Sequence, residues 1–91
     1  MREVFFIWDL EDEPDGNVQH VAEHGLTIEE VESVFRDRGS RTETSRSSGF
    51  PITFGTTNSG RYIVVVWEQV EKDPLCVRPI TAYEPSDDDQ P

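Results

Sequence analysis

Two short helices and the turn between them are specified by the stretch from Asn17 to Phe35, and this feature constrains the fold more than any other. Apolar residues recur at helical spacing up to His24, which predicts a first helix over residues 17–24. Gly25 follows, and glycine reaches the left-handed conformation of a helix C-cap without strain. Helices this short do not stand alone in water, so the pair must pack on another layer.

The second helix has a clear start signal. The Thr27 hydroxyl can accept from the backbone N–H of Glu30, whose carboxylate can reach back to the N–H of Thr27, and this arrangement is a capping box. Leu26 and Val31 are spaced as the hydrophobic staple that accompanies such a box. The expected inner and outer residues of this helix are Ile28, Val31, Val34 and Phe35 on one side and Glu29, Glu30 and Glu32 on the other.

Runs of β-forming residues occupy most of the remaining chain. Residues 61–70 form a largely apolar run, which is typical of a central strand. Pro79 has no N–H to donate, so its place in the last run marks an edge strand or a bulge. The expected strands are residues 3–8, 50–57, 61–70 and 75–83, with an exposed edge strand or a mobile loop within 36–49.

The resulting order of elements, β-α-α-β-β-β-β, predicts a two-layer α+β domain. Strands joined by short turns form an antiparallel sheet, and two short helices that come early and together should cover one of its faces. A chain of 91 residues has room for a single core. We therefore expect one domain over residues 1–83, followed by an acidic tail over 84–91 that lacks order.

A net charge of −11 at pH 7 limits the classes of partner. It argues against direct DNA binding, since affinity for a phosphate backbone comes mainly from Lys and Arg, and it suits a basic protein partner. Cys76 is the single cysteine, which excludes an internal disulfide and fits a reducing compartment. The apolar runs are too short for a membrane span and the first residues do not form a signal peptide, so we expect a cytoplasmic location and no membrane partner.

Two further features each allow a ligand-binding and a structural interpretation. The acidic loop over residues 9–15 is either a site for a metal or a basic partner, or a solvated loop in which Asp15 or Asn17 caps the next helix. His20 and His24 are four residues apart and share a helix face. Two ligands rarely make a metal site without a third, so no metal or other cofactor is expected.

Arginine residues interrupt the apolar strands at two places. Arg61 and Arg78 either extend to the sheet edge or present a guanidinium on the open face, where it could hold a phosphate. A further group within 36–49 is either an RNA-contacting edge or a charged edge strand that resists aggregation. That group consists of Arg36, Arg38, Arg41 and Arg46.

Several of these motifs follow one another in a distinctive order. They are Trp8-Asp9, Asn17, His24-Gly25-Leu26-Thr27, Glu29-Glu30-Val31, Val34-Phe35, Gly60-Arg61 and Arg78-x-Ile80-Thr81-Ala82. The pattern resembles the BrnT family, small bacterial toxins of type II toxin–antitoxin pairs with a RelE-like fold. The resemblance implies ribonuclease activity that inhibits translation, no metal cofactor, and neutralisation by a DNA-binding antitoxin. It matches Arg61 and Arg78 to basic positions of the family's sheet and His24 to its His-Gly turn.

Two functions are therefore expected. The first is a BrnT-like, metal-independent ribonuclease that contacts RNA or the ribosome. In this function His24 or Glu30 would act as the general acid or base, and Arg61 and Arg78 would stabilise the charge that develops on the phosphate. The alternative is a non-catalytic, acidic protein-interaction module on the same fold. It is favoured by the net charge and by Tyr83, which stands where the family has an arginine.

Overall fold

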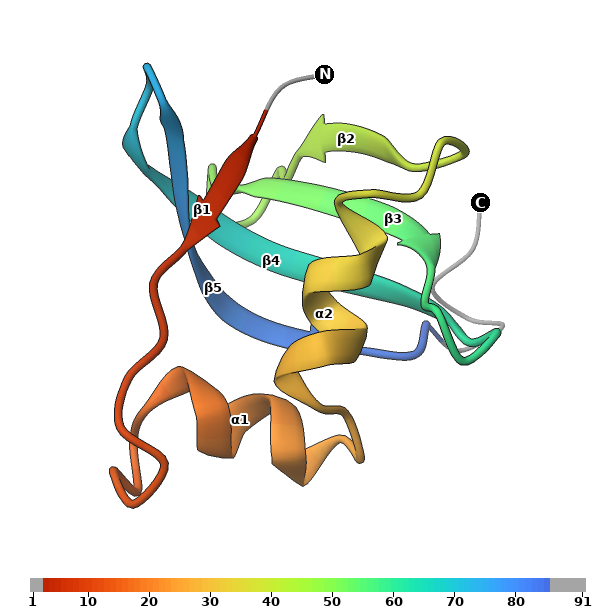
Figure 1. The fold of residues 1–91 in the computed structure, drawn as a ribbon. Helices are drawn as coiled ribbons and strands as arrows, with labels where there is room; N and C mark the ends of the chain where they lie inside the picture. Colours follow the sequence, from red (N-terminus) through yellow and green to blue (C-terminus); the bar gives the residue numbers. More distant parts are fainter. Residues whose placement is uncertain (1–2, 86–91) are drawn as a thin grey trace.

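Two helices and five strands follow one another in the order predicted from the sequence (Figure 1). The computed structural model describes residues 3–85. Its elements are β1 (Val4–Phe6), α1 (Asn17–Glu23), α2 (Ile28–Val34), β2 (Arg41–Thr44), β3 (Pro51–Thr56), β4 (Tyr62–Glu71) and β5 (Leu75–Tyr83). The predicted α+β class and its element order are confirmed.

The five strands form one sheet with the order β1-β5-β4-β3-β2. Strands β2 to β5 form the predicted antiparallel meander. Strand β1 differs from the prediction, because it pairs parallel with β5, Val4–Phe6 lying beside Leu75–Val77. The chain leaves β1, forms both helices and re-enters the sheet at the opposite edge, so the meander ends beside β1 (Figure 1).

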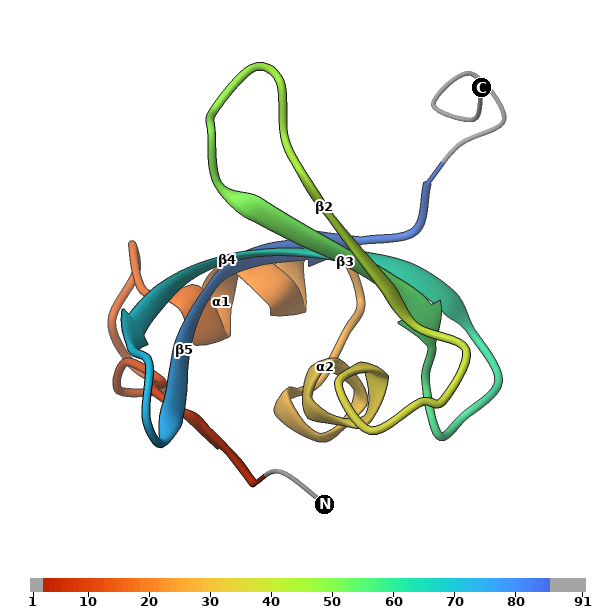
Figure 2. The same cartoon turned by 90° about the horizontal axis from the view of Figure 1, so that it is seen from above.

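Both helices lie on the same face of the sheet (Figure 2). The ring of Phe35, just after α2, joins this layer to the sheet, with its centroid 5.2 Å from that of Phe6 and 5.6 Å from that of Trp67. Edge contacts of this kind suit the charge distribution of aromatic rings. The buried core between the layers consists of Val21, Leu26, Val31, Val34, Ile63, Val65, Trp67, Val77 and Ala82.

The turn between the helices has the predicted geometry. Thr27 Oγ1 accepts from the N–H of Glu30 at 3.1 Å, and the Glu30 carboxylate accepts from the N–H of Thr27 at 3.2 Å, which completes the capping box. Gly25 has a φ of 74°, the left-handed conformation that favours glycine. Leu26 and Val31, the two residues of the predicted staple, are both buried.

The start of α1 departs from the prediction. Its N-cap is Gly16, which provides no side-chain cap, so the prediction that Asp15 or Asn17 caps this helix is wrong. A Cβ on Gly16 would lie 2.9 Å from the Cβ of Asp9, so a larger residue would collide with the loop. This close approach lets the Asp9 carboxylate accept from the N–H of Asn17 at 2.9 Å, which satisfies a donor at the helix start.

The strands agree with the predicted runs within a few residues. Strand β4 is central and β2 is an exposed edge strand, as expected. Pro79 lies opposite Trp67 at a register shift between β4 and β5, so of the two alternatives for this proline the bulge is correct. Strand β1 is three residues long, where the sequence predicts residues 3–8. Of the predicted tail over 84–91, residues 86–91 lie outside the described part of the chain.

Asn17 ties the first strand, the first helix and the last strand together. The residue is 2% exposed. Its Nδ2 donates to the carbonyls of Ile7 at 3.0 Å and Pro79 at 2.7 Å, and its Oδ1 accepts from the N–H of Asp9 at 2.8 Å. A buried amide with its polar atoms paired in this way permits one arrangement of its neighbours, so it fixes where the chain after β1 lies against β5.

Replacing this amide tests its structural role. Asn17→Ala should lower the free energy of unfolding by about 3 kcal/mol, because the carbonyls of Ile7 and Pro79 lose a donor in a buried setting. The urea midpoint measures the change. Asn58→Ala, a substitution of an exposed turn residue, is the control and should leave the midpoint nearly unchanged. Equal midpoints for the two variants would contradict the role given to Asn17.

Candidate functional site

Arg61 immediately precedes β4 and makes three polar contacts with distant parts of the chain. Its Nη1 donates to the carbonyl of Gly25 at 2.7 Å and lies 3.5 Å from Oε2 of Glu30. Its Nη2 donates to the carboxylate of Glu84, just after β5. The guanidinium therefore joins the turn between the helices to the end of the last strand. The Glu84 carboxylate chiefly raises the pKa of Arg61, so the arginine stays charged.

The carboxylate of Glu30 also has several hydrogen-bond partners. Its Oε1 completes the capping box with Thr27, and its Oε2 accepts from the hydroxyl of Ser59 at 2.6 Å. The Ser59 hydroxyl is the main cause that lowers the pKa of Glu30, followed among the lowering contacts by the backbone N–H of Thr27 and the charge of Arg61. Glu30 is therefore ionised at neutral pH, and its carboxylate positions both the turn and the arginine.

His24 lies at the C-terminal end of α1, next to the glycine that Arg61 contacts. Its side chain is exposed, and its ring centroid lies 6.0 Å from that of Tyr83. The structure thus brings together three of the four predicted catalytic residues at one end of β5. We call this group the Arg61 corner; its members are His24, Glu30, Arg61, Tyr83 and Glu84.

Arg78, the fourth predicted residue, lies apart from this corner. It precedes Glu84 by six residues along an extended strand, a separation of about 20 Å. Its Nη2 donates to Oδ2 of Asp9 at 2.7 Å, and its Nη1 lies 4.0 Å from a carboxylate oxygen of Glu68. Arg78 therefore holds the acidic loop against β5, and the two arginines do not converge on one phosphate-sized site.

Three members of the site region were not predicted as site residues. Ser59 contacts Glu30 across 29 positions of sequence, and Glu84 contacts Arg61 across 23. Contacts of this range depend on how the sheet and helices meet, so no local pattern indicates them. For Tyr83 the sequence offers one signal, its place at the position where the BrnT family, which the motifs resemble, has an arginine.

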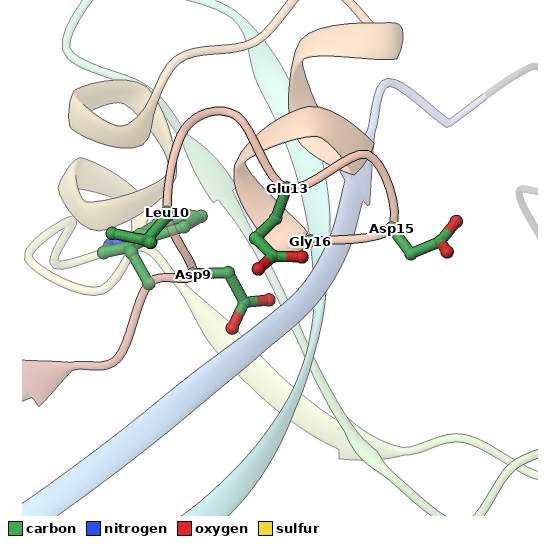
Figure 3. Close-up of a pocket in the computed structure, with 6 residues that line it drawn as sticks. Asp9, Leu10, Glu13, Asp15 and Gly16 are labelled. Carbon is green, nitrogen blue, oxygen red and sulfur yellow. The ribbon is translucent and has the colours of Figure 1, made fainter.

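The acidic loop forms a hollow of about 470 Å³ (Figure 3). Trp8 forms part of its wall and donates from Nε1 to Glu32 at 2.9 Å. Leu10 is 71% exposed at its rim. The hollow therefore combines apolar surface with carboxylates; its lining residues are Trp8, Asp9, Leu10, Glu13, Asp15 and Gly16.

The remaining candidates have structural contacts. His20 Nδ1 lies 3.3 Å from the carbonyl of Ile80. In residues 3–85, no group of three or more His, Cys, Asp or Glu side chains is arranged to hold a metal ion. Of the arginines around β2, Arg41 pairs with Glu43 at 3.3 Å and lies over the ring of Phe54, 4.5 Å from its centroid.

Comparison with known proteins adds no relative: no protein-family profile matches the chain, and no curated sequence is significantly similar to it. Neither of the described helices has the length and apolar character needed to cross a membrane.

Acid titration tests the role of the Asp9 contacts. The backbone N–H of Asn17 chiefly, and then Arg78, hold the pKa of Asp9 below its ordinary value of 3.8. A lowered folded-state pKa adds stability above that ordinary value and loses it as the pH falls through the folded-state pKa. Asp9→Asn should therefore reduce the loss of thermal stability between about pH 6 and about pH 2.

Asp15→Asn is the control. It removes a carboxylate of the same loop that takes no part in the hydrogen bonds of Asp9, and it should keep the wild-type pH dependence. Circular dichroism melts across the pH series measure both variants. Identical pH profiles for Asp9→Asn and the wild type would show that this carboxylate does not couple to folding.

Proposed function

We propose that the chain is a BrnT-like toxin, a metal-independent ribonuclease that inhibits translation and acts through the Arg61 corner. The observation that supports this proposal is that an imidazole, a guanidinium and a phenol from three separate segments lie at one end of the sheet. Cleavage of a phosphodiester needs a group that moves protons beside a fixed positive charge. The motif resemblance supplies the reaction class, and the corner supplies groups suited to it.

In this proposal Arg61 holds the scissile phosphate. The guanidinium keeps its position because Gly25 and Glu30 contact Nη1, while Nη2 faces Glu84. The side chain of Glu84 is 54% exposed, so it can move aside for a phosphate oxygen. Charge-assisted donation from a guanidinium then stabilises the additional negative charge of the transition state.

His24 is the proton carrier in this proposal. Its imidazole takes the proton of the ribose 2′-hydroxyl, the 2′-oxygen bonds to phosphorus, and the bond from phosphorus to the 5′-oxygen breaks. The leaving 5′-oxygen takes a proton from water, and the hydroxide that remains takes back the proton held by His24, so the products are a 2′,3′-cyclic phosphate and a 5′-hydroxyl. Glu30 acts as a positioning residue because its carboxylate is already committed to Thr27 and Ser59. Arg78 acts outside the site and holds the acidic loop.

Induced expression in a bacterial host without an antitoxin is expected to arrest growth and break down total RNA. With purified protein and a chelator present, His24→Ala should slow RNA cleavage about 100-fold, because general acid–base catalysis contributes about 10²–10⁴-fold. Glu23→Ala changes the neighbouring exposed residue and is the matched control, with the wild-type rate expected.

Two results would count against this proposal. Normal growth and intact RNA with abundant soluble wild-type protein would exclude the ribonuclease. Cleavage by His24→Ala at the wild-type rate would leave an enzyme but remove His24 from its mechanism.

A non-catalytic module that binds a basic protein, such as an antitoxin, is the second candidate. The hollow of the acidic loop favours it, because Glu13 and Asp15 are exposed there beside the apolar surface of Trp8 and Leu10. A lysine or arginine side chain could rest its methylene groups on this surface and its charge on the carboxylates. Binding of a basic partner that weakens steeply with salt, and weakens in Glu13→Gln, would support this module.

A further inference from the structure

Strand β2 leaves one edge of the sheet open. It is the last strand on its side, paired only with β3, and all four of its residues are exposed (Figure 1). An open edge presents unpaired N–H and C=O groups to which another extended strand can bind. Which strand fits depends on the groups that point outward and on the side chains beside them.

The hydrogen bonds of the β2–β3 ladder identify the outward-pointing groups. Ser45 donates its N–H to the carbonyl of Phe50 at 2.8 Å, so this pair is a hydrogen-bonded one. Hydrogen-bonded and non-hydrogen-bonded pairs alternate along an antiparallel ladder. Thr42, opposite Thr53, is therefore a non-hydrogen-bonded position, and its backbone N–H and C=O point away from β3 to the free edge. The contact of 2.9 Å between the Thr42 and Thr53 hydroxyls fits the closer side chains of such a pair.

One register of a second copy of β2 at this edge pairs opposite charges across a twofold axis. In a continuous antiparallel sheet, the side chains of two residues that face each other lie on the same face of the sheet. A twofold axis through the edge can therefore place Thr42 opposite Thr42 of the partner subunit. Their outward N–H and C=O groups then form two reciprocal hydrogen bonds. Arg41 faces Glu43 of the partner subunit, and the same ion pair occurs again on the other side of the axis. A register centred on Arg41 or on Glu43 would instead bring like charges together.

We propose that two copies of this chain associate through β2, antiparallel and centred on Thr42, with reciprocal pairs between Arg41 and Glu43. The two side chains lie on the same side of the strand and pair with each other at 3.3 Å, and they are 56% and 51% exposed, so a partner strand can reach both charged groups. An edge with charges of one sign would repel its copy, whereas this edge carries one charge of each sign. The loop over 9–15, which is rich in carboxylates, lies at the far end of the molecule from β2 (Figure 1).

Charge reversal tests the proposal by sedimentation velocity over a protein series from about 10 µM to about 1 mM. The wild type should shift from 10.4 kDa toward twice that mass as its concentration rises. Arg41→Glu and Glu43→Arg should each weaken self-association about tenfold or more, because both ion pairs become like-charge pairs. An equal mixture of the two variants should associate again, since each acidic edge then faces a basic one.

The control is Glu23→Arg, which makes the same charge change as Glu43→Arg on exposed α1 and should associate like the wild type. Circular dichroism should give the same spectrum for all four proteins, because β2 packs no buried side chain. A wild type that stays at 10.4 kDa throughout the series would overturn the proposal. So would single reversals that associate as well as the wild type, or a mixture that fails to recover.

Discussion

The buried amide of Asn17 is the interaction on which the arrangement of this domain depends. A parallel strand at the edge of an antiparallel meander has no turn to fix its register, and β1 contributes only three residues of pairing. The amide supplies the missing constraint, because it bonds to the chain after β1 and to the carbonyl of Pro79 on β5 at once. The same contacts place Asp9 beside the start of α1. There its carboxylate accepts hydrogen bonds from the N–H of Asn17 and from Arg78. A polar cluster therefore contacts the middle of the last strand, at Arg78 and Pro79.

The C-terminal end of the same strand has a different kind of ion pair, and the difference distinguishes a structural arginine from one that an anion can reach. Arg78 contacts Asp9, whose carboxylate is fixed by a backbone N–H. Arg61 contacts Glu84, whose side chain is more than half exposed and follows the last strand. An arginine whose counter-ion can leave is available to an incoming anion, whereas an arginine paired within a fixed cluster is not. The acidic surface limits how strongly RNA can be attracted from a distance, so the proposed ribonuclease function requires short-range contacts at the Arg61 corner.

The sequence predicted those features that local chemistry controls. The capping box at Thr27, the glycine at the helix end and the central strand all follow from neighbouring residue types, and each is present. The parallel pairing of β1 could not be read in this way, because it depends on an amide that acts across 62 positions of sequence.

The role of Asn17 depends on the same long-range contact. Its place near a helix start predicts a cap, but its side chain donates to the carbonyl of Pro79 in the sheet instead. For the candidate site, the sequence indicates which residue types could take part, but it does not show which of them lie together in the fold. Two arginines that look equivalent in the sequence lie apart, because Arg78 is on β5 about 20 Å along the chain from Glu84, the residue that Arg61 contacts.

An NMR titration of the ¹⁵N-labelled protein tests whether the Arg61 corner binds RNA. The ligand is a short RNA whose 2′-hydroxyls are methylated, so that it cannot be cleaved. We predict amide shift changes at Gly25, Ser59, Arg61 and Tyr83, with Glu84 released from its contact with Arg61. Shift changes confined to the acidic loop, or none at RNA concentrations near millimolar, would contradict the assignment of the Arg61 corner as the functional surface.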